Sequence, residues 1–157
     1  MSQVIFCRKG DSMKESLLIS GCLLGLCCRY DGKSKPWDKD ALERLNQKYR
    51  LIPVCPEQLG GLTTPREPAE RCGDRFVTQT GKDVTEQYQR GAQEILRLAR
   101  FFECKKALLK EKSPACGTGQ IYDGSFTRTL VSGNGAAAEL LLNNGVAVVG
   151  ESRIEEL

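Results

Sequence analysis

The sequence predicts a single α/β domain with a mostly parallel, Rossmann-like sheet and helices on both faces. Short continuous apolar runs recur along the chain and are typical of strands covered on both faces. Amphipathic helical patterns alternate with these runs, which favours parallel strands joined by helical crossovers. The length of 157 residues suits one domain with a sizeable hydrophobic core.

The first half of the chain contains two predicted strands and a helix between them. The strands are expected over residues 17–22 and 51–54, and Pro53 indicates an edge strand or a strand end. Asp38 is the predicted N-cap of a helix that extends to Tyr49.

The second half repeats the alternation. The clearest amphipathic pattern predicts a helix over residues 83–102, followed by a strand over 107–109. A short helix is expected over 136–143 and is stopped by Gly145, and the last buried strand follows over 146–149.

Three segments lie outside this alternation. Residues 58–70 are rich in Gly, Pro and Thr and are predicted to be an irregular, functional loop. Residues 76–78 indicate a small extra strand, and 121–126 a turn-containing loop. Residues 1–12, including Cys7, are interpreted as an N-terminal tail that precedes a domain of residues 13–157.

The composition excludes several kinds of chemistry. The chain has no histidine, so Ser–His and Cys–His catalysis and His-ligated zinc are excluded. A net charge of +3 and 6% aromatic residues give no sign of a nucleic-acid-binding face. The chain instead has eight cysteines, several of them in apolar runs, which favours reduced thiols or metal ligands over a disulfide framework.

The sequence also bears on localisation. Residues 18–22 resemble a lipoprotein cleavage box, but the apolar segment before it is too short for a signal peptide. No apolar run approaches the length of a transmembrane helix. We therefore expect a cytoplasmic protein without a membrane partner.

Three cysteines each follow a predicted strand. Cys22, Cys55 and Cys116 stand beside Gly or Pro where a buried run ends, and Glu151 follows the last run. Because the carboxyl ends of parallel strands meet at one edge of a sheet, we expect these four side chains on one rim.

Several interpretations of the three thiols stay open from the residues alone. Each could be an ordinary buried cysteine. A structural zinc site usually uses Cys-x2-Cys pairs, and so does a thioredoxin-like dithiol, but the chain contains no such pair. Thiolates that converge from separate loops suit an iron–sulfur cluster with one iron left open.

Polar residues beside the thiols are candidate catalytic and binding groups. Glu57 could donate a proton if burial raises its pKa, and Ser113 could hold a substrate or a water molecule. Lys110 could pair with Glu57 or with an anion, although a solvated lysine is the more usual finding.

Three further charged residues are candidates for substrate binding. Arg29, Asp31 and Arg66 lie in the predicted rim loops and could contact a polar heterocycle. Salt bridges that brace the loops are the ordinary alternative for each of them.

Six ordered blocks together resemble the bacterial thiouracil desulfidase family, which was long known as a domain of unknown function. The resemblance extends from about residue 17 to 151. The blocks are SGCLLG (20–25), CRYDG (28–32), VCPE (54–57), GGLTTPREPAE (60–70), LKEKSPACG (109–117) and IYDGSF (121–126).

This resemblance implies a cofactor and a reaction. It implies a [4Fe–4S] cluster held by Cys22, Cys55 and Cys116, with Cys28 as the alternative to Cys55. The open iron would bind the sulfur of 2- or 4-thiouracil, and water would replace that sulfur to give uracil without net redox change. Glu57 and Ser113 match the family's catalytic residues.

The sequence departs from the family pattern at two small residues, Gly21 where alanine is common and Ala115 where serine is common. Two other functions stay open: desulfuration of thiolated uridine in nucleosides or tRNA, and a non-catalytic metal or sulfur carrier. The preferred substrate, the final sulfur acceptor and the oligomeric state do not follow from the sequence. It gives Cys27 and Cys72 no role, and Cys104 is expected to be a packing residue.

Overall fold

The structure, a computed structural model, describes residues 14–157, so the predicted tail and Met13 lie outside the described residues. Its centre is a four-stranded parallel sheet with the order β2-β1-β5-β8. The strands are β1 (Ser16–Ser20), β2 (Arg50–Val54), β5 (Lys106–Leu109) and β8 (Ala147–Gly150). The predicted α/β fold is confirmed, and Pro53 lies on the edge strand β2 as expected.

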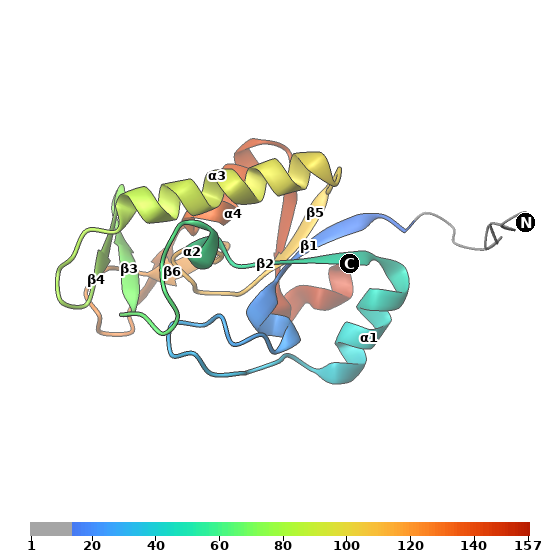
Figure 1. Ribbon diagram of the computed structural model, residues 1–157, viewed down its shortest axis with the longest axis horizontal. Helices are drawn as coiled ribbons and strands as arrows, with labels where there is room; N and C mark the ends of the chain where they lie inside the picture. Colours follow the sequence, from blue (N-terminus) through green and yellow to red (C-terminus); the bar gives the residue numbers. More distant parts are fainter. Residues whose placement is uncertain (1–13) are drawn as a thin grey trace, which may run out of the picture.

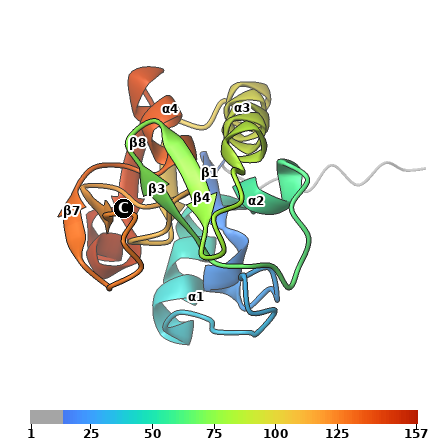
Figure 2. The same ribbon diagram turned by 90° about the vertical axis from the view of Figure 1, so that its left-hand side faces the viewer.

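Helices cover both faces of this sheet, as Figures 1 and 2 show. On one face lies α1 (Lys39–Lys48), with the short 3-10 helix η2 (Glu151–Glu156) after β8. On the other face lie α3 (Thr85–Phe101) and α4 (Ala136–Asn143), which pack against each other.

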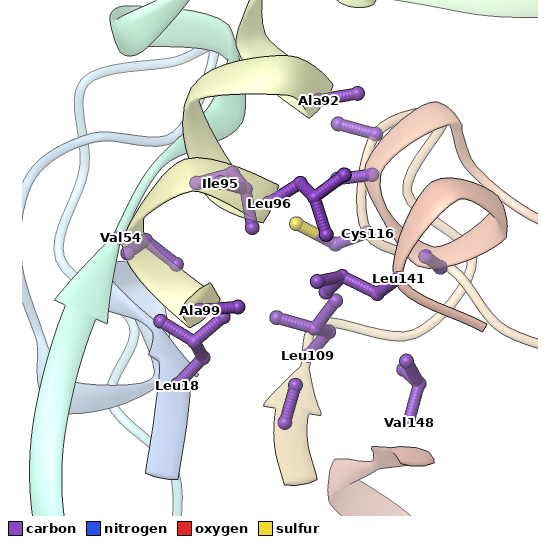
Figure 3. Close-up of a cluster of buried hydrophobic side chains, with 14 of the residues drawn as sticks. Leu18, Val54, Ala92, Ile95, Leu96, Ala99, Leu109, Cys116, Leu141 and Val148 are labelled. Carbon is purple, nitrogen blue, oxygen red and sulfur yellow. The ribbon is translucent and has the colours of Figure 1, made fainter. Parts of the chain in front are cut away.

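Strand β1 shows why the sequence forms two cores. Leu18 packs into the core under α3 and α4, whereas Leu17 and Ile19 pack into the core on the α1 side, and all three are fully buried. This alternation follows from the two-residue period of a strand, and it explains the continuous apolar run. Figure 3 shows the core under α3 and α4, with Cys116 among its side chains.

The helix ends follow local sequence signals. Asp38 is the N-cap of α1, and its Oδ1 accepts the N–H of Ala41 at 2.8 Å, as predicted. Gly145 follows α4 with φ +80°, a conformation that favours glycine and ends the helix.

Two antiparallel hairpins lie beyond the carboxyl ends of the sheet strands (Figure 1). The first pairs β3 (Ala69–Cys72) with β4 (Arg75–Thr78), and the second pairs β6 (Gln120–Tyr122) with β7 (Leu130–Ser132). The small strand expected near residue 76 is confirmed as part of β4.

Two segments predicted to be loops are partly helix or strand at their ends. The segment 58–70 begins in the one-turn helix α2 (Pro56–Leu59) and ends in β3. The segment 121–126 begins within β6. Both strands, β3 and β6, are short and are stabilised by pairing with a neighbouring strand. A strand of three or four residues shows little hydrophobic periodicity, so the sequence did not predict them.

The connections give the sheet a switch point. From β1 the chain passes through α1 to β2 on one side, and then crosses back to β5 on the other side of β1. Ligands of open α/β sheets bind beyond the strand ends at such a point, between β1 and β5 here.

Candidate active site

A cavity of about 710 Å³ lies at the carboxyl ends of the strands. Four cysteines from four segments line it: Cys22, Cys28, Cys55 and Cys116. The three that were expected at one rim therefore share one cavity, and Cys28 joins them. Glu57, Ser113, Arg29 and Arg66 line the same cavity.

The thiol of Cys28 lies beside those of Cys22 and Cys55. Cys22 is in the 3-10 helix η1 (Gly21–Leu24) directly after β1, and Cys55 precedes α2. The Cys55 Sγ lies 3.7 Å from the carbonyl oxygen of Cys28. Gly21 lies beside Cys28, because a Cβ on Gly21 would be in ordinary van der Waals contact with the Cys28 Sγ, at 3.5 Å.

The surroundings disfavour the thiolate form of Cys28, Cys55 and Cys116. The neighbouring Cys28 thiol, together with burial and the Glu57 charge, raises the pKa of Cys55, and burial and the Glu57 charge raise the pKa of Cys116. The neighbouring Cys22 thiol raises the pKa of Cys28. Ionisation of these thiols therefore needs a nearby positive charge, such as metal ions supply.

Glu57 and Arg66 form an ion pair in the cavity, with side chains that are only 15% and 8% exposed. The Glu57 Oε2 also lies 3.8 Å from the Cys55 Sγ. Burial raises the pKa of Glu57, and the Arg66 guanidinium opposes this shift. Arg66, a candidate for substrate binding, is therefore the partner that favours the charged form of Glu57.

Ser113 closes the turn that carries Cys116. Its Oγ accepts the N–H of Ala115 at 3.2 Å and that of Cys116 at 3.1 Å. Because two N–H groups donate to this oxygen, the Ser113 O–H can act as a hydrogen-bond donor to a bound group or to the neighbouring Cys116 thiol.

Two cavity residues were missed from the sequence. Ser20 is buried beside the Cys116 thiol, and its Oγ accepts the N–H of Lys110 at 2.9 Å. Its place two residues after Leu18 puts it on the α3 and α4 face, which strand periodicity could have shown. Tyr88, expected only in the apolar stripe of α3, is buried and lines the cavity, with its ring stacked on Phe76 at 4.7 Å.

Arg29 and Asp31 pair with each other. The Arg29 Nε lies 3.3 Å from the Asp31 Oδ1, which also accepts the N–H of Lys33 at 3.0 Å. Arg29 lines the cavity, whereas Asp31 is not among the lining residues and is linked to the cavity through its pair with Arg29.

Lys110 pairs with Glu151 rather than with Glu57. Glu151 lies at the sheet rim, as expected, but it is buried and also accepts the N–H of Glu111 at 2.7 Å. Its carboxylate joins the end of β8 to the segment that leads to Cys116.

Close backbone packing places α2 against α3. A Cβ on Gly91 would lie 2.0 Å from the Pro56 carbonyl oxygen, and one on Gly60 would lie 2.0 Å from that of Gln87. These glycines bring Cys55 and Glu57, at the start of α2, over the end of the sheet.

Comparison with known proteins identifies the family. The model of the 2-thiouracil desulfurase family matches residues 17–153. The chain belongs to the 2-thiouracil desulfurase family. The match spans all four cavity cysteines, together with Glu57 and Ser113, and it confirms the resemblance found in the sequence.

Two relatives of this desulfurase family member are informative. The uncharacterized protein YbbK of Bacillus subtilis (strain 168) is 38% identical over 151 residues, which cover 90% of this chain and 99% of that protein. The solved structure of a [4Fe-4S]-dependent thiouracil desulfidase, TudS, is 44% identical, with a TM-score of 0.88 over 92% of this chain and 95% of that one.

Two kinds of site or segment are absent from the described part of this desulfurase family member. Among residues 14–157, no three or more Asp, Glu or Cys side chains converge on the position of a single metal ion. None of the helices in this part has the length and apolar character to cross a membrane.

Proposed function

We propose that this protein is a [4Fe–4S]-dependent desulfidase that converts thiouracil to uracil. The observation that carries the proposal is the set of four thiols in one cavity beside a buried carboxyl group, in a chain 44% identical to a thiouracil desulfidase of that kind. The substrate is a small thiolated pyrimidine, 2- or 4-thiouracil.

The residues of the cavity suit such a cofactor. Thiolates are the ligands of iron–sulfur clusters, and here they come from separate segments around a space of about 710 Å³. Burial and the neighbouring thiols disfavour the ionisation of Cys55 and Cys116, which the positive charge of iron would compensate. A bound cluster would supply a Lewis-acidic, thiophilic iron that polarises the C–S bond of the substrate.

Cys22, Cys55 and Cys116 are the proposed ligands. They follow β1, β2 and β5, which are neighbouring strands. The sheet therefore fixes the positions from which the three cysteine-bearing segments leave it. Cys28 is the alternative to Cys55, because its thiol lies beside both Cys22 and Cys55.

Glu57 is the proposed proton donor. The net reaction exchanges the C=S group of thiouracil for C=O at the expense of one water and releases sulfide, so no electrons are gained or lost. The ring accepts a proton from Glu57 as the C–S bond breaks and returns one as the C=O group forms. The attacking water, whose two protons balance the hydrogen sulfide released, restores the proton of Glu57. A carboxyl group whose pKa is raised by burial is suited to this exchange. Arg66 then stabilises the carboxylate that remains.

Ser113 is the proposed hydroxyl donor. Two backbone N–H groups hold its Oγ in place, so its O–H can orient the substrate oxygen or sulfur, or the incoming water. The same contacts fix the turn that presents Cys116.

We also propose that residues 13–157 form one domain. In support, the two cores draw on segments from Leu17 to Leu157 around a single sheet.

Anaerobic reconstitution with iron and sulfide tests the function. The proposal predicts visible absorption of an iron–sulfur cluster, about four irons per chain, and sulfide release from 4-thiouracil in equimolar amount with uracil. Binding of fewer than about three irons per chain, or the absence of uracil from a fully loaded protein, would reject it.

A further inference from the structure

A buried carboxylate outside the proposed catalytic groups holds the tip of the β6–β7 hairpin. Glu70, on β3, is 8% exposed, and its Oε2 accepts the N–H of Gly124 at 2.9 Å and that of Phe126 at 3.0 Å. A carboxylate is costly to bury unless it is hydrogen-bonded, and bonds from N–H groups to a charged acceptor are among the stronger ones.

The hairpin tip adopts a conformation that it would not keep unaided. Phe126 and Arg128 have φ of 58° and 60°, in the left-handed region that side chains other than glycine disfavour. Such backbone persists only where the surroundings hold it. Gly124, at φ +93°, approaches β3 so closely that a Cβ would lie 3.1 Å from the Arg71 carbonyl oxygen.

This tip contributes to the cavity that the thiols line. Tyr122, Phe126 and Arg128 are all part of its lining, although the cysteines lie on other segments. A flat pyrimidine ring packs favourably against an aromatic side chain. The bonds of Glu70 to the backbone therefore determine where an aromatic surface stands in the cavity.

We propose that Glu70 is a positioning residue for substrate binding, which holds Phe126 as the surface against which the thiolated pyrimidine ring packs. This inference rests on the proposed function for the identity of the ring. It assigns to the hairpin the recognition of the ring, whereas the sheet edge holds the proposed cluster ligands.

Substitution of Glu70 separates these two tasks. Glu70→Ala removes the oxygen that accepts both N–H groups, so the tip relaxes and the KM for 4-thiouracil rises about tenfold or more, with a smaller effect on kcat. Iron content and visible absorption stay at the wild-type level, because the cysteines keep their positions. Glu70→Gln keeps an acceptor oxygen and restores most of the affinity.

A readout independent of activity follows the tip itself. Amide hydrogen exchange in Glu70→Ala should be faster at Gly124 and Phe126, in both cofactor-free and reconstituted protein. The matched control is Asp74→Ala, in the exposed turn of the same β3–β4 hairpin, which should leave exchange and KM unchanged.

Phe126 provides a second variant if Glu70→Ala folds poorly. Phe126→Ala should raise KM with iron content unchanged, and Phe126→Tyr should keep the wild-type KM. The inference is overturned if Glu70→Ala or Phe126→Ala binds thiouracil as tightly as wild type, or if exchange at the tip is unaltered. The proposed function fails separately, through an inactive or iron-free wild-type protein, and the exchange measurement would still test the role of Glu70.

Discussion

Arg66 and Glu57 form an ion pair inside the cavity that the four cysteines line. The same guanidinium donates to the carbonyl oxygen of Cys28 at 3.0 Å and to that of Thr63 at 3.3 Å. One side chain thus sets the charge of the proposed proton donor and also holds the loop that carries a fourth thiol.

Replacement of Arg66 by alanine should lower both stability and turnover. The Glu57 carboxylate would lose its cationic partner in a buried place, a change that costs about 3–5 kcal/mol for fully buried pairs and less here, since water reaches part of the cavity. Chemical denaturation of the cofactor-free protein measures the loss. Arg97→Ala, on the exposed surface of α3, is the control and should change little.

Replacement of Glu57 by glutamine should keep the cofactor and remove the proton donor. Because the amide preserves the shape and a bond to Arg66, iron content should match wild type, whereas kcat should fall by about 10²–10⁴. Steady-state sulfide release at matched iron loading makes the comparison. Wild-type kcat in this variant would remove Glu57 from its assigned role.

Gly91→Ala should displace α2 through backbone packing alone. The new Cβ would lie 2.0 Å from the Pro56 carbonyl oxygen, so Cys55 and Glu57 must move with the helix. Overpacking of this kind costs about 1–3 kcal/mol, which thermal unfolding of the cofactor-free protein can measure. Gln93→Ala, exposed on the same helix, should be neutral or slightly stabilising. Equal melting temperatures for the two variants would contradict the packing described.

Glu151→Ala should destabilise the protein without a direct effect on the chemistry. Glu151 is 2% exposed and bonds to Lys110 and to the N–H of Glu111, so its loss leaves a donor unsatisfied and a lysine unpaired. We expect a loss of about 2–4 kcal/mol in urea unfolding. Glu155→Ala, at the exposed pair with Arg44, is the matched control and should lose at most about 1 kcal/mol.

The fold was predictable because a strand that is buried on both faces of the sheet has a continuous apolar sequence. Leu17, Leu18 and Ile19 are consecutive and apolar since the sheet has a core on each side. The strands β3 and β6 have no such sequence. Ala69–Cys72 includes two charged residues, and its pairing depends on β4 and on the contacts of Glu70 with the second hairpin.

The site was predictable in part, for a topological reason. Cys22, Cys55 and Cys116 could be placed at one rim because each follows a parallel strand. Cys28 could not, since it lies in a loop whose path depends on a bond from Arg66, which is distant in sequence. The pairing of Lys110 with Glu151 instead of Glu57 likewise depends on which strands are neighbours, since β5 lies beside β8.

The most direct test of the account is iron bound per chain, measured after anaerobic reconstitution of Cys116→Ser and Cys104→Ser. Both side chains are buried, but only Cys116 lines the cavity, whereas Cys104 packs in the core. We predict that Cys116→Ser loses bound iron and sulfide release from 4-thiouracil, and that Cys104→Ser keeps both. Full iron binding and sulfide release by Cys116→Ser would contradict the assignment of this cavity as the iron–sulfur site.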